Sequence, residues 1–224
     1  MTVRAHFERK LNELNDEILR MGKLVEAELK LALEAFAQLD AAKAKEVSAA
    51  DRLVNRARFD IEEKCFSLIV TQQPAARDLR AITTAMNIIV DLERIGDQAK
   101  GVAKVVPRLQ ATPVAFYPPE LTQMGELVTK MLSQVMVAFA RKNVDLARIL
   151  AGQDDEVDAF YARVFTQIME QMADAASADK VEATYELLRA ARELERVGDL
   201  VTNIGERIVY LETGSLEEIN VDRA

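Results

Sequence analysis

The sequence of 224 residues contains no tryptophan, one cysteine and one histidine. A single cysteine cannot form an internal disulfide, which fits a reducing compartment, and Cys65 is expected to be a small buried residue. The one histidine, His6, lies near the N-terminus, and no glycine-rich phosphate loop is present. A Ser-His-Asp catalytic set is therefore not expected, and we predict a protein that is not an enzyme.

Glycine and proline are also scarce, with eight and five residues, and both destabilise helix interiors. Their scarcity favours long helices. The net charge of −8 and the lack of a basic stripe argue against binding to nucleic acid. The sequence has no run of about 18 apolar residues, so insertion into a membrane is not expected. Because no signal peptide opens the chain, a cytoplasmic location is predicted.

The first half of the chain has the pattern of three helices. Apolar side chains recur in steps of three and four from Phe7 to Leu39, as in a helix that packs one face against its neighbours. Asp40 is a plausible N-cap for a second helix over about 42–72. Pro74 fits the first turn of a third helix, which is predicted to end near Val106.

The second half begins after a segment, 107–119, that contains four of the five prolines. This composition predicts a linker. The helical pattern then restarts over about 120–141, continues from a break at Asn143 to about 175, and resumes after Ser177 to about 211. Gly214 is a natural stop signal for the last helix.

The two halves are copies of one unit. MGKLV at 21–25 recurs as MGELV at 124–128, an offset of 103, and LERIGD at 92–97 recurs as LERVGD at 194–199, an offset of 102. Such ordered matches indicate an internal duplication. The predicted fold is all-α, with two tandem antiparallel three-helix bundles at 1–106 and 120–214, a linker at 107–119 and a C-terminal tail at 215–224.

Both copies carry a pair of acids on one helix face. Glu93 and Asp97 are four residues apart, and Glu195 and Asp199 repeat this spacing. Like charges at this spacing repel, so helix stability alone does not favour them. A glycine precedes the second acid of each pair, which would let a neighbouring helix or a ligand approach closely. For one such pair a solvated charged face would be the simpler interpretation, but its recurrence at the same place in both copies favours a cation site, so both interpretations stay open.

Further oxygen-bearing side chains come from the second helix of each unit. Asp51 is followed by Asn55, and the corresponding Asp154 by Asp158. Oxygen ligands suit magnesium, calcium, manganese or iron, whereas structural zinc would require nearby cysteine or histidine. The second copy is richer, since the counterparts of Asn203 and Glu206 are a glycine and a lysine, so the first site should bind more weakly. The predicted metal ligands are Asp51, Glu93 and Asp97 in the first copy, and Asp154, Asp158, Glu195, Asp199, Asn203 and Glu206 in the second.

The motif QPAARDLR at 73–80, together with both copies of the LER(I/V)GD motif, resembles the PhoU family over nearly the whole chain. The resemblance implies two three-helix bundles and a negative regulator of phosphate-starvation signalling. It implies two partners, the ATPase subunit of the phosphate ABC transporter and a membrane sensor histidine kinase, and iron or other metals on the motif acids. A homodimer is also expected. This sequence departs from many members, which have histidine after the motif aspartate, where Gln98 and Leu200 stand here.

The predicted function is therefore a non-catalytic adaptor in phosphate uptake and signalling. Two alternatives are a metal-dependent phosphohydrolase, which turnover of phosphoesters would reveal, and a purely structural bundle whose acids are solvated. Arg77, Asp78 and Arg80 could contact a partner or phosphate, or simply form a charged helix start.

Overall fold

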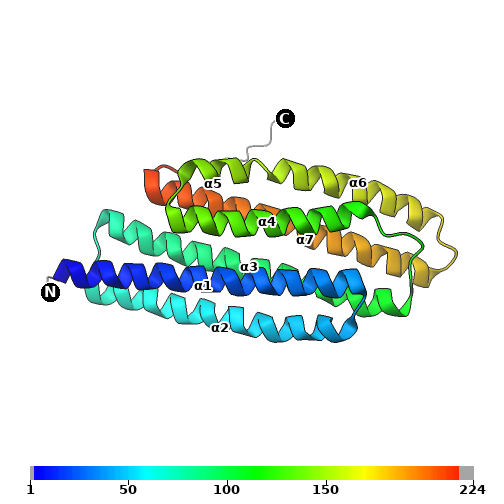
Figure 1. Ribbon diagram of the computed structural model, residues 1–224, viewed down its shortest axis with the longest axis horizontal. Helices are drawn as coiled ribbons and strands as arrows, with labels where there is room; N and C mark the ends of the chain where they lie inside the picture. Colours follow the sequence, from blue (N-terminus) through cyan, green and yellow to red (C-terminus); the bar gives the residue numbers. More distant parts are fainter. Residues whose placement is uncertain (1–2, 217–224) are drawn as a thin grey trace.

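The structure is a computed structural model that describes residues 3–216 (Figure 1). Every regular element in this range is an α-helix, which confirms the predicted all-α class. The predicted tail at 215–224 lies mostly outside the described residues. The seven helices are α1 (Val3–Gln38), α2 (Ala41–Gln72), α3 (Ala76–Ala111), α4 (Pro119–Arg141), α5 (Val144–Ala151), α6 (Asp154–Ala173) and α7 (Ala178–Thr213).

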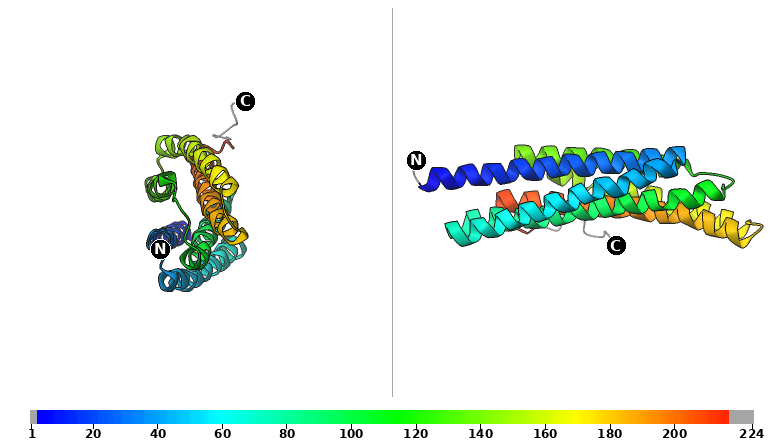
Figure 2. Two further views of the ribbon diagram at one scale, coloured as in Figure 1. Left: turned by 90° about the vertical axis from the view of Figure 1, so that its right-hand side faces the viewer. Right: turned by 90° about the horizontal axis from the view of Figure 1, so that it is seen from below.

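The helices form two elongated bundles that lie side by side (Figures 1 and 2). Helices α1, α2 and α3 run antiparallel and pack on one another, and α4 to α7 form the second bundle. A helix of 36 residues, such as α1, is about 54 Å long at 1.5 Å per residue. Two units of this kind are what the internal repeat predicts.

The middle helix of the second unit is broken, which the sequence analysis did not predict. The expected continuous helix to about residue 175 is instead α5 and α6, separated by Gly152 and Gln153. The repeat places Ala49 and Ala50 at these positions in the unbroken α2. Glycine lowers helix stability relative to alanine, and the acids that open α6 favour a new helix N-terminus.

The helix ends follow local capping, with two corrections at prolines. Asp40 caps α2 by accepting from the backbone N–H of Ala42 at 2.8 Å, as predicted. Asn143, its counterpart in the repeat, caps α5 in the same way. Pro74 lies two residues before α3 and not in its first turn. Pro107 lies inside α3, so the predicted linker start is wrong: buried residues on either side of the exposed proline anchor the helix, which continues to Ala111.

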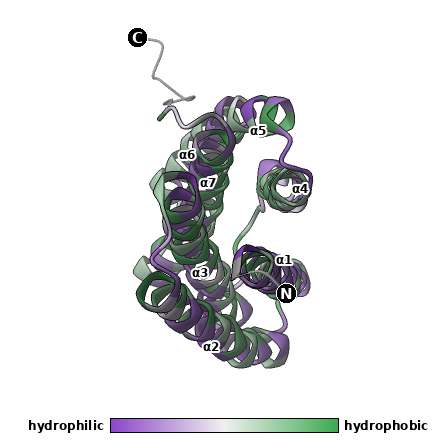
Figure 3. Ribbon diagram, turned by 90° about the vertical axis from the view of Figure 1, so that its left-hand side faces the viewer, coloured by the Kyte–Doolittle hydropathy of each residue, from purple (hydrophilic) through white to green (hydrophobic). Residues whose placement is uncertain are grey.

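One continuous apolar core joins the two units. Helices α3 and α7 pack extensively along the middle of the molecule, and α1 lies beside α4 on one side of it. Seen end-on, α3 and α7 lie in the middle of a curved row of helices that runs from α5 to α2, with α4 and α1 on its concave side (Figure 3). The two bundles therefore fold against each other as one body, which fixes where each acidic motif faces.

The contact between α1 and α4 is nearly symmetric. A Cβ atom on Gly22 would lie 2.7 Å from Met136 Cε, and a Cβ atom on Gly125 would lie 2.6 Å from Leu33 Cδ2. Gly22 corresponds to Gly125 and Leu33 to Met136, each at the repeat offset of 103. Each helix therefore inserts one large side chain into the gap left by a glycine of the other.

Replacing Gly125 by leucine should lower the free energy of unfolding by about 1–3 kcal/mol, because the new side chain occupies the space of Leu33. Chemical unfolding followed by circular dichroism measures this. Gly152→Leu is the control, since a Cβ atom there meets nothing closer than 3.6 Å. Adding Leu33→Ala to Gly125→Leu should restore part of the loss. A Gly125→Leu protein as stable as Gly152→Leu would contradict the described packing.

Candidate functional site

In the first unit, acids from three helices gather around Gly96. Asp51 of α2 is 7% exposed, and Glu93 and Asp97 of α3 lie half-buried and exposed respectively. The third helix to contribute is α1, through Glu28. A Cβ atom on Gly96 would lie 3.0 Å from Glu28 Oε2. The motif glycine thus makes room for a carboxyl group of a neighbouring helix, as the sequence analysis allowed.

Glu28 is the most deeply buried acid of this cluster. Its side chain is 1% exposed, and neither carboxyl oxygen has a hydrogen-bond partner. Burial, with smaller contributions from the charges of Asp51 and Asp97, raises the pKa of Glu28 to about 8, although Lys100 opposes the shift. At neutral pH this carboxyl group is therefore mainly protonated.

Lys100 lies in the middle of the first cluster. Its ammonium group donates to Asp51 Oδ2 and to Asp97 Oδ1, both at 2.8 Å. The Asn55 amide donates to the same Asp51 oxygen at 3.1 Å. Burial opposes the charged form of Lys100, but the two hydrogen bonds more than compensate and raise its pKa. Asp51 and Asp97 are thus already paired with a positive charge from the chain itself.

In the second unit, four acids from α6 and α7 come together. The pKa of Glu195 is raised by burial and then by the charges of Asp199 and Asp158. Burial also raises the pKa of Asp199, which a hydrogen bond with Asp154 opposes. Asp154 is 3% exposed, and a Cβ atom on Gly198 would collide with its Oδ1 atom. Carboxyl groups from two adjacent helices of one unit therefore lie together beside Gly198.

The two clusters differ at the positions that the repeat aligns. Met131 stands where the first unit has Glu28, and Thr202 stands where it has Lys100. Thr202 is buried, and its hydroxyl has no hydrogen-bond partner. Asn203 and Glu206, the other two predicted ligands of the second unit, lie one and two helical turns beyond Asp199. The Asn203 side chain is exposed and that of Glu206 is half-buried. The second cluster therefore lacks the lysine of the first, while the charges of Arg192 and Arg196 act on Glu195.

A family model described as the PhoU domain matches the chain twice, over residues 18–106 and 121–208. These segments cover most of the sequence and coincide with the two bundles. The chain belongs to the PhoU family. The duplication found in the sequence is thus a tandem pair of PhoU domains.

Relatives match the chain from end to end. A phosphate-specific transport system accessory protein PhoU homolog of Clostridium acetobutylicum is 35% identical over 97% of this chain and 99% of its own length. The crystal structure of the phosphate transport system regulatory protein PhoU from Streptococcus pneumoniae has a TM-score of 0.87 at 34% identity, covering 95% and 99% of the two chains. PhoU from Pseudomonas aeruginosa has a TM-score of 0.88 at 32% identity, covering 93% and 100%. These PhoU relatives are accessory or regulatory proteins of phosphate transport.

Two residues of the first cluster, Glu28 and Lys100, were not among those predicted from the sequence. Glu28 carried a signal, because it interrupts the apolar stripe between Val25 and Ala32 at a position that should face the core. Lys100 carried a weaker one, as a lysine one turn after Asp97 that the second copy lacks. The expected weakness of the first site was attributed to Gly101 and Lys104, but the group in contact with the acids is Lys100.

The fit of a metal ion to these clusters differs between the units. In the first unit, an ammonium group already occupies the space between Asp51 and Asp97, so a metal ion does not fit there. In the second unit the donors are carboxylates, the ligands that hard cations prefer, and the positive charges that act on Glu195 are those of Arg192 and Arg196. Within residues 3–216, no three histidine, cysteine, aspartate or glutamate side chains are already arranged around one metal position. Exposed side chains such as Asp158 and Asp199 would have to turn to reach a shared ion.

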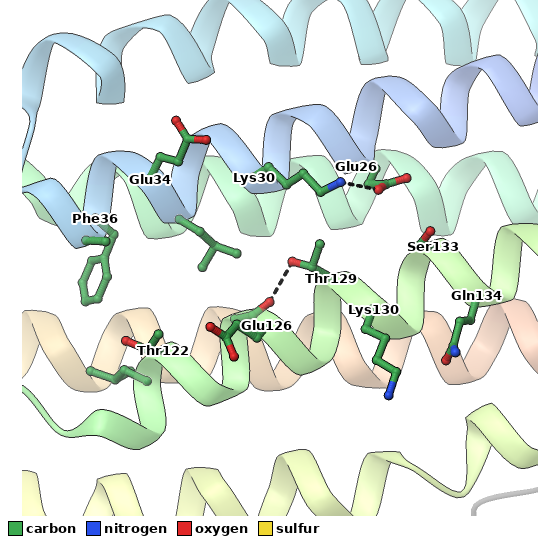
Figure 4. Close-up of a pocket in the computed structure, with 14 residues that line it drawn as sticks. Glu26, Lys30, Glu34, Phe36, Thr122, Glu126, Thr129, Lys130, Ser133 and Gln134 are labelled. Atoms are coloured by element: carbon green, nitrogen blue, oxygen red, sulfur yellow. Dashed lines mark hydrogen bonds and ion pairs between the residues drawn. The ribbon is translucent and has the colours of Figure 1, made fainter.

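A groove of about 640 Å³ lies between α1 and α4, away from both acidic clusters (Figure 4). Leu33, Phe36 and Leu121 contribute apolar surface, and charged residues line its edges. On one edge, Lys30 is paired with Glu26 (Figure 4). None of the predicted metal ligands lines this groove.

Other sequence predictions also have a structural outcome. Cys65 is buried, and burial raises the pKa of its thiol to about 12, which confirms a packing role. Asp78 forms an ion pair with Arg4, and the guanidinium of Arg80 lies 5.7 Å from the ring centre of Tyr210. These contacts favour the interpretation of both residues as structural. Across the described range, 3–216, no helix combines the length and hydrophobicity of a membrane span.

Proposed function

We propose that this protein is a negative regulator of phosphate uptake and phosphate-starvation signalling that acts as a non-catalytic adaptor. The observation that carries the proposal is the match of both domains, over nearly the whole chain, to accessory and regulatory proteins of phosphate transport. The partners would be the ATPase subunit of the phosphate ABC transporter and a sensor histidine kinase. The protein would work in the cytoplasm, as a homodimer.

Charge supports an adaptor role. The chain has a net charge of −8, and the acidic clusters place Asp97, Asp158 and Asp199 at the surface of two rigid bundles. Acidic surfaces favour basic patches on a partner, and such complementarity increases the rate and specificity of association. Long helices joined by one core hold these surfaces at a fixed separation.

A cation site in the second unit is part of the proposal. Asp154, Asp158, Glu195 and Asp199 would hold it, and magnesium, calcium, manganese and iron all suit oxygen ligands. The chemistry that such an ion supplies is neutralisation of the clustered acids: burial raises the pKa values of Glu195 and Asp199, and the charges of Asp199 and Asp158 raise that of Glu195 further. The protein's own residues would position the ion at the surface that α6 and α7 share.

Binding of the purified transporter ATPase subunit should weaken as salt rises, because salt screens charges at an exposed interface. Co-purification and binding isotherms at low and high salt measure this. Replacing Asp158 and Asp199 by asparagine should weaken binding at low salt. The matched control replaces Asp145 and Asp174, which are exposed acids outside the cluster, and should have a smaller effect.

The outcomes separate two parts of the proposal. Salt-independent binding, with equal effects of both double substitutions, would remove the electrostatic explanation and leave the adaptor role intact. Failure to bind either the ATPase subunit or the kinase, at low salt and with metal supplied, would contradict the adaptor role itself.

A further inference from the structure

Helices α1 and α4 pack against each other with no third helix on their seam. Helices α1, α2 and α3 each pack on the other two, and α4, α6 and α7 do the same. Within residues 3–216, no helix packs extensively against both α1 and α4. The groove of about 640 Å³ lies along this seam, between the two helices (Figure 4). The seam thus has the packing surface of a helix pair that a third helix could complete.

The shape of the groove fits a helix. Its lining residues extend over 26–37 on α1 and over 121–134 on α4. At 1.5 Å per residue these stretches are about 16 Å and about 20 Å long, or about three to four helical turns. Lining positions recur every three or four residues, as at Lys30, Leu33 and Ala37. Side chains at this spacing form the ridges and grooves that receive a packed helix.

The floor of the groove is apolar. Leu33 and Phe36 are half-buried and pack on the core, and Ala37 beside them is exposed. The polar side chains are spread along both helices and do not converge on one point, as a small-molecule site would require (Figure 4). The floor therefore fits the apolar face of an amphipathic helix.

The charged side chains of the groove are sorted by sign along its length. Glu34 of α1 and Glu126 of α4 lie toward the end that contains Phe36 (Figure 4). Lys30 and Lys130 lie further along the same two helices (Figure 4). One end of the groove, the acidic end, therefore carries glutamates from both walls, and the other, the basic end, carries lysines from both walls.

The charges on α1 are already paired within the chain. Lys30 contacts Glu26, which also lines the groove, and Glu34 contacts Lys43, which does not. The charges on α4 are not paired. Glu126 is exposed, as is Lys130, and within residues 3–216 neither forms an ion pair. The α4 wall therefore presents one free acid and one free base to an occupant.

We propose that this groove is a docking site for an amphipathic helix of a partner protein, which binds parallel to α4. A helix carries partial positive charge at its N-terminus and partial negative charge at its C-terminus. The bound helix therefore begins at the acidic end and finishes at the basic end. It carries lysine or arginine in its first turn and aspartate or glutamate in its last. The proposal rests neither on the partners nor on the cation site proposed above.

The test measures binding of two labelled peptides to the full chain by fluorescence anisotropy at low salt. Both are capped helical peptides of about 14 residues, with leucines three and four residues apart. The first has lysines in its first turn and glutamates in its last, and the second has these exchanged. The first should bind about tenfold more tightly, because the interactions with all four groove charges change sign between the peptides. The helix dipole favours the second peptide as a free helix, so this preference cannot come from the peptides themselves.

Substitutions in the chain locate the binding. Ala37→Arg places a long, positively charged side chain at the acidic end and should weaken binding of the first peptide at least tenfold. Ala140→Arg is the matched control, because the repeat aligns Ala140 with Ala37 and it is exposed outside the groove. Glu126→Lys combined with Lys130→Glu should remove the preference between the two peptides. Circular dichroism checks that each variant is folded.

Three results would each overturn the proposal. They are failure of both peptides to bind, equal binding of the two peptides, and equal weakening by Ala37→Arg and Ala140→Arg. None of them bears on the adaptor role, which is tested separately by binding of the ATPase subunit and the kinase.

Discussion

Replacing Glu28 by glutamine should raise the free energy of unfolding at alkaline pH and flatten its dependence on pH. Glutamine keeps the shape of the protonated carboxyl group but carries no charge at any pH. The two proteins should be similar in stability below about pH 4.5, diverge as pH rises, and differ most above about pH 8. The free energy of unfolding, measured by urea denaturation across this range, is the readout.

The direction follows from the raised pKa of this acid. The pKa of Glu28 is about 8 in the folded protein, compared with 4.5 when exposed, mainly because of burial and then because of Asp51 and Asp97. Between these values the folded state binds a proton that the unfolded state has released, so the free energy of unfolding falls as pH rises. Each pH unit between the two values contributes at most about 1.4 kcal/mol, so the total reaches a few kcal/mol.

Glu126→Gln is the matched control, because Glu126 is exposed on α4 and has no role in either cluster. Its pH profile should follow that of the unaltered protein. Burial raises the pKa of Asp91 to about 6, so this acid also lowers the free energy of unfolding as pH rises. Because Asp91 is present in all three proteins, it does not affect the comparison between them. Parallel profiles for Glu28→Gln and the unaltered protein would show that the Glu28 carboxyl group is not buried as described.

Most of the fold was predictable because its signals are local. The apolar periodicity, the Asp40 cap and the Gly214 stop are each determined by neighbouring residues, and the structure has all three. The break at Gly152 and Gln153 also had a local signal, which was missed, whereas the error at Pro107 arose where tertiary packing opposes a local signal. Pro107 is tolerated in α3 because Val106 and Leu109 are buried in the shared core.

The site was predictable only on the helices that carry the repeat motif. The pairing of Asp154 with Asp199 follows from helical spacing and the antiparallel arrangement of two consecutive helices. Glu28 could not be assigned to the cluster in this way, because the face that α1 turns toward Gly96 depends on how three helices pack. Lys100 was overlooked because its effect depends on a contact with Asp51, which lies 49 positions earlier in the chain.

The most direct test of the proposed regulatory function is expression from a phosphate-starvation promoter in cells grown in abundant phosphate. Deletion of the gene for this protein should raise the activity of the promoter severalfold above its activity in the parent strain. The transporter and the kinase would then lack the adaptor that reports abundant phosphate. Restoring the unaltered gene in the deletion strain should silence the promoter again. A deletion strain that still silences the promoter in abundant phosphate would contradict the proposal.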